Sequence, residues 1–126
     1  MTHRITKNFS DKEFVCRCGM ACVLSEHSRI SEDFVRKLQS VRDVVGPMRI
    51  NSGSRCVVHN RRIGGSLNSR HLAIYSGKSM AADIQCTSSR MRYALVKEAV
   101  RLGLTIGVHP KFVHLDSRES PILFLY

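Results

Sequence analysis

Tryptophan is absent from this 126-residue chain, and aromatic residues make up only 6% of it. Aliphatic side chains must therefore supply most of the core that a 43% hydrophobic content allows. No apolar run approaches the roughly 18 residues that cross a bilayer, and the chain opens with no apolar signal segment. The length fits one domain over residues 1–126. We therefore expect a protein that is made in the cytoplasm without a signal peptide.

Acidic residues are scarce, with 10 Asp and Glu against 20 Lys and Arg, for a net charge of +10. Such a surface attracts polyanions, which include nucleic acids and the anionic polymers of the bacterial envelope. The basic residues are spread along the chain, with clusters at 61–62 and 90–92. No zinc-finger spacing or aromatic RNA-binding motif accompanies them, so the sequence favours envelope polymers over nucleic acid.

Cysteine occurs five times, and three of these residues, Cys16, Cys18 and Cys22, lie close together. Without a signal peptide, free thiols are the expected state. The three close cysteines could hold a structural metal, but they lack the C-x2-C spacing and a clear fourth ligand. The pattern favours partly buried thiols and leaves the metal open, while Cys56 and Cys86 are interpreted as small core residues.

Capping residues and hydrophobic periodicity predict an α+β fold, in which a small antiparallel sheet is flanked by helices. The Ser-x-x-Glu box at Ser10 predicts a short helix. Ser31 predicts the start of a long helix that ends at Gly46, and residues 87–89 predict the start of a second that ends at Gly103. A shorter helix is expected over 57–63, and strands over 48–51, 80–85, 105–108, 112–116 and 122–125.

Two histidines and one carboxylate indicate a catalytic site. They are His71, Asp83 and His114. Two imidazoles and a carboxylate with an open fourth position are a usual ligand set for catalytic zinc. Alternation along a strand places His114 and Asp116 on one face, towards a cleft, and their apolar neighbours towards the core. Asp83 lies in an otherwise apolar strand and needs a partner, which is either a metal or an arginine.

Six short elements surround these residues in a fixed order. They are Ser52-Gly53-Ser54-Arg55, His59-Asn60, Gly64-Gly65, Ser69-Arg70-His71, Ala81-Ala82-Asp83 and His114-Leu115-Asp116. Together, over residues 10–118, they resemble the zinc peptidases of the D-alanyl-D-alanine carboxypeptidase type, which include phage endolysins and other cell-wall peptidases (M15-like).

The resemblance implies a fold shared with Hedgehog and D-alanyl-D-alanine peptidase domains, with zinc held by His71, Asp83 and His114. It also implies that Arg55 binds a substrate carboxylate or the oxyanion, and that Ser52 and Ser69 help to bind substrate. His109, in a turn beside the ligand strand, is a candidate for supporting a metal ligand or stabilising the transition state.

The sequence departs from that family at three places. Ser54 stands where relatives usually have tyrosine, and Lys111 stands where several branches have an acidic general base. His71 and Asp83 are twelve positions apart, which is farther than in the family and predicts a longer loop at the cleft within residues 72–80. Asp116 is the remaining carboxylate near the last motif, and it is either the general base or the partner that orients His114.

The expected function is zinc-dependent hydrolysis of peptide bonds in peptidoglycan stem peptides, by a monomer of phage or prophage type that reaches the cell wall after release. Carboxypeptidase and endopeptidase action both remain open. One alternative is a non-catalytic zinc-binding module of the same fold that binds cell wall or a protein. Another is a basic nucleic-acid-binding protein without a metal.

Overall fold

The computed structural model describes residues 3–74 and 77–126, which form a small domain of helices and one sheet. The elements in chain order are η1 (Asp11–Phe14), α1 (Val23–Glu26), α2 (Glu32–Val45), β1 (Ile50–Ser52), α3 (Val57–Arg62), β2 (Ala81–Gln85), α4 (Ser89–Arg101), β3 (Thr105–Val108), β4 (Phe112–Asp116) and β5 (Leu123–Leu125). This order confirms the predicted α+β class. The short helix α1 was not predicted.

The five strands form one sheet in the order β1-β2-β4-β3-β5. Neighbours are antiparallel from β1 to β3, but β5 is parallel to β3. The sheet is therefore mixed: the pairings from β1 to β3 are antiparallel, as expected, and the parallel pairing of β5 was not predicted. The chain turns back after β4 and passes to the outer edge of β3, so it runs in the same direction as β3.

The two long helices begin where the sequence predicts. The Ser31 hydroxyl accepts a hydrogen bond from the Phe34 amide at the start of α2, and the Ser88 hydroxyl accepts one from the Met91 amide at the start of α4. Each satisfies an amide that has no partner within its helix. Gly46, with φ 98°, then ends α2 in a conformation that disfavours a side chain.

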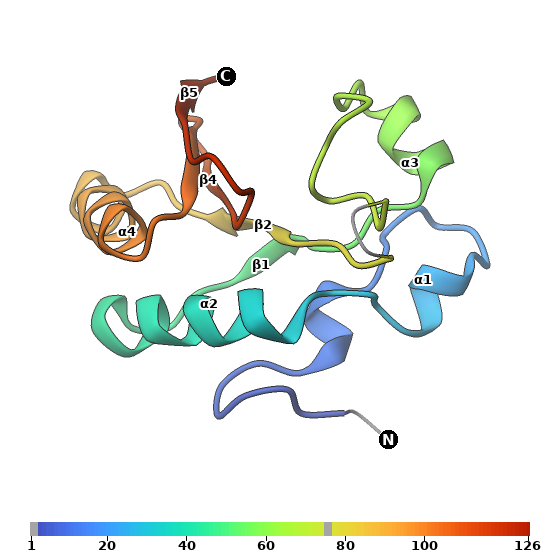
Figure 1. Cartoon of the computed structure of the whole chain (residues 1–126), viewed down its shortest axis with the longest axis horizontal. Coiled ribbons are helices and arrows are strands. Elements are labelled where there is room, and N and C mark those ends of the chain that lie inside the picture. The colour runs from blue at the N-terminus through green and yellow to red at the C-terminus, as the bar shows by residue number, and fades with distance from the viewer. Residues whose placement is uncertain (1–2, 75–76) are drawn as a thin grey trace.

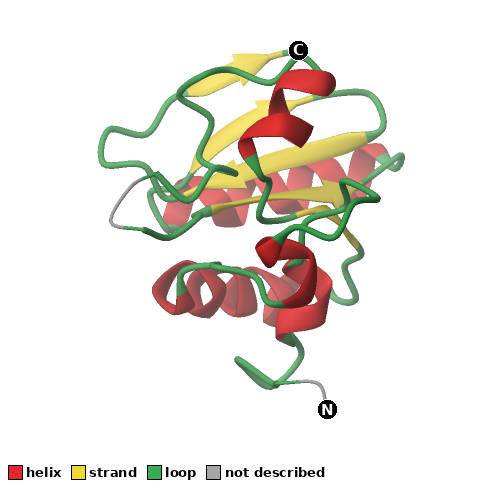
Figure 2. Ribbon diagram, turned by 90° about the vertical axis from the view of Figure 1, so that its right-hand side faces the viewer, coloured by secondary structure: helices red, strands yellow, loops and turns green. Residues whose placement is uncertain are grey.

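Helices α2 and α4 pack against each other and cover one face of the sheet, whereas α3 lies on the other side (Figure 1, Figure 2). Strand alternation sends Ile84, Val113 and Leu115 into the core under these helices. Asp83 and His114, which alternate with these core residues, share a cleft with the residues that follow α3. The fold thereby gives the sheet an apolar face and a face available for polar groups.

The N-terminal segment adds two aromatic side chains to the core. Ser10 and Glu13 form the predicted capping box, although the helix that follows is a single 3-10 turn. Phe9 and Phe14 are buried, with ring centroids 5.8 Å apart. A Cβ on Gly53 would lie 2.6 Å from the Phe14 Cα, so a glycine is required where this segment crosses the end of β1. In the described part of the chain, no helix has the length and apolar character to cross a membrane.

Candidate metal centre

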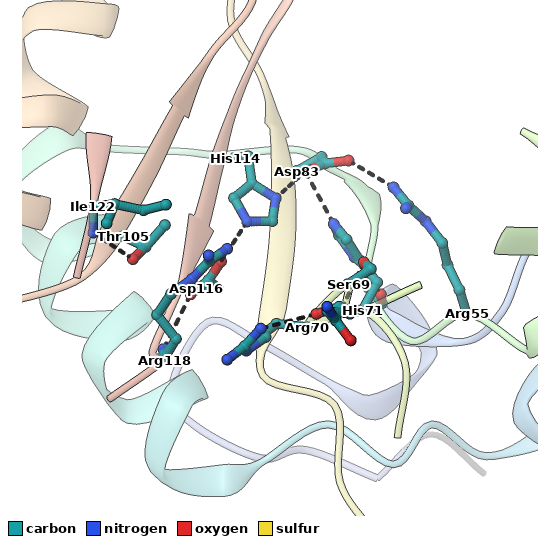
Figure 3. A network of polar contacts seen from close by, with 12 residues as sticks. Arg55, Ser69, Arg70, His71, Asp83, Thr105, His114, Asp116, Arg118 and Ile122 are labelled. Atoms are coloured by element: carbon teal, nitrogen blue, oxygen red, sulfur yellow. Dashed lines mark hydrogen bonds and ion pairs between the residues drawn. The ribbon is translucent and has the colours of Figure 1, made fainter. Parts of the chain in front are cut away.

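Three side chains predicted as metal ligands meet on the polar face of the sheet (Figure 3). Asp83 on β2 and His114 on β4 are direct partners in the antiparallel ladder. His71 follows α3 in the sequence and is held beside them because its carbonyl accepts a hydrogen bond from the Arg55 amide (2.8 Å). One ligand atom from each residue lies within 4.8 Å of the others.

The carboxylate of Asp83 is the centre of this arrangement. Its Oδ1 lies 3.2 Å from His71 Nε2 and 3.0 Å from His114 Nδ1. All three side chains are buried, with exposed fractions of 2%, 6% and 4% for His71, Asp83 and His114. Such a close, desolvated set of two imidazole nitrogens and a carboxylate oxygen suits zinc.

The second nitrogen of each imidazole is also occupied. His71 Nδ1 donates to the Gly53 carbonyl at 2.7 Å, and His114 Nε2 lies 2.7 Å from Asp116 Oδ2. Because a carbonyl can only accept, His71 carries a proton on Nδ1, and in the neutral ring this leaves the lone pair of Nε2 available to a metal. Metal-binding histidines usually have this pattern, in which the remote nitrogen fixes the tautomer and the ring orientation.

Burial and neighbouring charges set the protonation of the three groups. Burial lowers the pKa of His71, despite its hydrogen bond with Asp83. Burial also opposes the charged forms of His114 and Asp83, but hydrogen bonds outweigh it: those from Asp116 and Asp83 raise the pKa of His114, and those from His114 and His71 lower the pKa of Asp83. The carboxylate is therefore ionised near neutral pH, as a metal ligand must be.

Asp116 lies beneath His114 and has no exposed surface. The Arg118 side chain contacts both carboxylate oxygens, from Nε to Oδ1 at 2.9 Å and from the terminal nitrogen to Oδ2 at 2.7 Å. The expectation that Asp116 faces an open cleft was therefore wrong, because β2 and β3 flank it and Arg118 covers it. This geometry suits a residue that orients His114.

Arg55 closes the other side of Asp83. Its terminal nitrogens lie 3.0 Å from Asp83 Oδ2 and 3.2 Å from Asn60 Oδ1, and its Nε donates to Ser52 Oγ at 3.0 Å. Asn60 in turn donates to the Ser66 carbonyl, and a Cβ on Gly65 would lie only 2.1 Å from Asn60 Oδ1. The His-Asn and Gly-Gly elements of the sequence thus hold the arginine. Ser52 serves the same purpose and does not line the cleft.

The three ligands open onto a cleft of about 470 Å³. The residues that line it are Arg55, Ile63, Gly64, Gly65, Ser66, Ser69, Arg70, His71, Asp83, Phe112, His114, Arg118, Phe124 and Tyr126. Ser69 lines the cleft, as its predicted role in substrate binding requires. Among the described residues of this lining, Asp83 has the one carboxylate side chain.

An aromatic wall of Phe112, Phe124 and Tyr126 was missed by sequence reasoning. Phe124 lies 5.6 Å from the His114 ring, centroid to centroid, because Gly107 on the strand between them leaves room for it. A Cβ on Gly107 would lie 2.5 Å from the Phe124 ring. Burial raises the pKa of Tyr126 to about 12, so its hydroxyl remains a hydrogen-bond donor. The apolar run at residues 122–125 predicted a strand, but such a run does not reveal which strand it joins.

His109 and the inserted loop lie elsewhere. The His109 ring stacks on Phe112 at 4.4 Å, and its Nδ1 accepts from the Lys111 amide. It borders a neighbouring hollow with Tyr126 instead of the cleft itself. In the predicted loop at 72–80, residues 75–76 lie outside the described residues. Gly77 and Lys78 line a separate hollow near the N-terminal segment, so this part of the loop does not border the cleft.

Comparison with known families agrees with this arrangement. The family model described as Peptidase M15 matches residues 7–116, which include all three proposed ligands, Arg55 and Asp116. No curated protein sequence matches the chain. The family match covers most of the chain and includes the residues of the metal centre, and the chain therefore belongs to the peptidase M15 family.

Proposed function

We propose that this peptidase requires zinc and hydrolyses peptide bonds in the stem peptides of peptidoglycan, as a wall-lysing enzyme of phage or prophage type. The observation that carries the proposal is the convergence of His71 Nε2, Asp83 Oδ1 and His114 Nδ1 at the base of a cleft. Membership of the peptidase family indicates the reaction class, which is peptide hydrolysis. The set of two imidazoles and one carboxylate indicates zinc as the metal.

The residues present fit a zinc ion in both number and chemistry. His71, Asp83 and His114 would hold it, and the cleft leaves the remaining position open to a substrate. Bound zinc would act as a Lewis acid on the scissile carbonyl and lower the pKa of a water molecule. The chain itself supplies the orientation, because Gly53 fixes the ring of His71 and Asp116 fixes the ring of His114.

The charge of the cleft favours an anionic peptide. Arg55, Arg70 and Arg118 all contribute to its lining, beside the aromatic wall. A guanidinium presents forked donors that match a planar carboxylate, and stem peptides carry carboxylates at their ends and side chains. We assign Arg55 to the substrate carboxylate or oxyanion, because it contacts the proposed metal ligand Asp83 directly.

We assign Asp116 to the orientation of His114 and not to proton transfer. Its carboxylate is engaged by His114 and Arg118 and is shielded from the cleft. His109 would then act through Phe112 and Tyr126, by positioning the aromatic wall.

A non-catalytic zinc-binding module is the second candidate function. It is favoured by one observation: the described lining of the cleft offers no carboxylate side chain besides Asp83. Such a protein would bind wall material through the same basic and aromatic groups without cleaving it.

Incubation of the purified protein with peptidoglycan, followed by mass spectrometry of the muropeptides, separates the two. Hydrolysis predicts new stem-peptide ends that are lost in His114→Ala and retained in Lys111→Ala, a change at an exposed residue of the same region. Co-sedimentation with peptidoglycan without any new peptide ends would instead support the binding module. Intact muropeptides without binding would contradict both.

A further inference from the structure

A second group of potential metal ligands lies outside the cleft. The Sγ atoms of Cys16, Cys18, Cys22 and Cys56 are all within 4.8 Å of one another. Three of them come from the irregular segment before α1, and the fourth is the residue that caps α3. The sequence showed no fourth ligand because Cys56 lies 34 positions beyond Cys22, and only the fold brings it near.

We propose that these four cysteines bind a structural zinc ion as thiolates. In a tetrahedral site with Zn–S bonds of about 2.3 Å, neighbouring sulfurs are about 3.8 Å apart. Cys18 Sγ and Cys22 Sγ are 3.6 Å apart, close to that spacing. The four sulfurs are thus grouped for one ion, and a set of four cysteines is a common ligand set for structural zinc.

The backbone around the sulfurs has the donors that metal thiolates need. The Met20 amide donates to Cys18 Sγ and the Cys56 amide to Cys16 Sγ, each at 3.3 Å. The His59 amide donates to Cys56 Sγ at 3.4 Å. Hydrogen bonds from backbone amides stabilise the negative charge of a thiolate and fix the direction of its lone pairs.

The turn between the first ligands also fits this role. Gly19, with φ 74°, reverses the chain immediately after Cys18, and the Cys22 amide donates to the Met20 carbonyl. Arg62 reaches this turn, with a terminal nitrogen 3.8 Å from Met20 Sδ. A zinc ion with four thiolates has a net charge of −2, so a guanidinium near the site would offset part of it.

Other functions for these thiols fit less well. Cys16 and Cys18 are buried, with exposed fractions of 4% and 7%, which is unfavourable for a redox sensor. A disulfide would join two of the four sulfurs and would not explain why the other two lie beside them.

The site would connect two parts of the chain that the sheet does not hold together. Residues 15–22 contain no helix or strand, and Cys56 directly follows Arg55, which contacts Asp83. A metal at this point would link the N-terminal segment to the start of α3 and support the arginine of the cleft. Structural zinc commonly provides such a link where a small domain has little local secondary structure.

Metal content of the full chain, purified under reducing conditions, tests the proposal. Elemental analysis should give two zinc ions per chain, and one in the double variant Cys18→Ser/Cys22→Ser. Cys86→Ser is the matched control, because Cys86 is a buried thiol outside the cluster, and it should retain two. Cys22→His should also retain two, since three cysteines and one histidine together bind zinc.

A double variant at the other centre, His71→Ala/His114→Ala, keeps this test independent of the proposed function. It should lose one zinc and keep the other, and the remaining ion should be released by a mercurial reagent that reacts with thiolates. Cobalt substituted into this variant should show thiolate-to-metal charge-transfer bands, a measurement that leaves all four cysteines unchanged.

Three results would overturn the proposal: a wild-type chain with one zinc that all cysteine variants retain, a cobalt spectrum without charge-transfer bands, or an intramolecular disulfide in the freshly reduced and metal-supplied protein. Loss of peptidase activity with both metals in place would count against the proposed function alone.

Discussion

The two groups of potential metal ligands are built in different ways. His71, Asp83 and His114 are anchored on or beside the sheet, and Asp83 and His114 are paired residues of adjacent strands. Cys16 and Cys18 lie on a segment without regular structure, and Cys22 and Cys56 are the N-cap residues of the short helices α1 and α3. The sheet therefore holds the first group in place before any metal binds, whereas the second group lies outside the sheet, where the proposed zinc would add the stronger link.

This difference separates the roles of the two sites. A preorganised site loses little conformational entropy on binding and can leave a position open for a substrate. A site closed by four side chains contributes its binding free energy to the folding of the segment. The first arrangement is suited to catalysis and the second to stability.

The largest expected effect comes from removing a ligand of the preorganised site. His71→Ala, Asp83→Ala and His114→Ala should each reduce hydrolysis of peptidoglycan by more than about 100-fold, because loss of a mere outer partner typically costs tenfold to a hundredfold. Each variant should lose the zinc of this site and retain the thiolate-bound one. Muropeptide release and elemental analysis of the same samples measure both, and full occupancy in all three variants would refute the ligand assignment.

Asp116→Asn should have the next largest effect. The substitution removes the charge that holds the His114 ring and leaves Arg118 with a weaker partner. We expect zinc affinity and turnover to fall together, by about tenfold to a hundredfold, because the ring is less well oriented. Competition with a chromogenic chelator gives the affinity, and initial rates give the turnover. A large loss of rate at unchanged affinity would instead identify Asp116 as the general base.

Gly107→Ala tests how closely the aromatic wall is packed against the ligand strand. The new Cβ would meet the Phe124 ring at 2.5 Å, so the ring must move away from His114. Overpacking of this kind typically costs about 1–3 kcal/mol of the free energy of unfolding. Chemical denaturation measures the cost, with Val100→Ala on the exposed face of α4 as a control. Equal stability of the two variants would show that the Phe124 ring can move aside without a cost in the free energy of unfolding.

The smallest effect is expected at His109. Its ring lies behind Phe112 and outside the cleft, so His109→Ala should change the KM for a stem peptide more than kcat, through movement of Phe112 and Tyr126. Lys111→Ala, at an exposed neighbour, should stay within about twofold of the wild type in both, since surface substitutions usually change free energies by less than about 0.5 kcal/mol. A fall in kcat alone for His109→Ala would give His109 a direct part in the reaction.

Local patterns predicted the elements that depend on neighbouring residues. The strands at 105–108 and 112–116 and the caps at Ser31 and Ser88 were correct because alternation and capping act over a few residues. The motif order predicted that His71, Asp83 and His114 come together, and the fold places one ligand atom of each within 4.8 Å of the others.

Features that depend on distant parts of the chain could not be predicted in this way. The burial of Asp116 follows from its central position between β2 and β3 and from Arg118, and the parallel pairing of β5 follows from its passage to the far side of β3. Cys56 was interpreted as a core residue, but it is half-buried, caps α3 and lies beside Cys16. Its approach to the other thiols depends on the packing of the N-terminal segment against β1.

The opposite ring orientations of the two histidines distinguish them chemically. His71 turns Nε2 towards Asp83, whereas His114 turns Nδ1 towards it. In ¹⁵N spectra the two rings should therefore appear as different neutral tautomers in the loaded protein, with the proton on Nδ1 in His71 and on Nε2 in His114. The side-chain amide of a glutamine lies near the position of a histidine Nε2, and the side-chain amide of an asparagine lies near the position of Nδ1. The substitution that best keeps a polar atom facing Asp83 is therefore His71→Gln at one position and His114→Asn at the other.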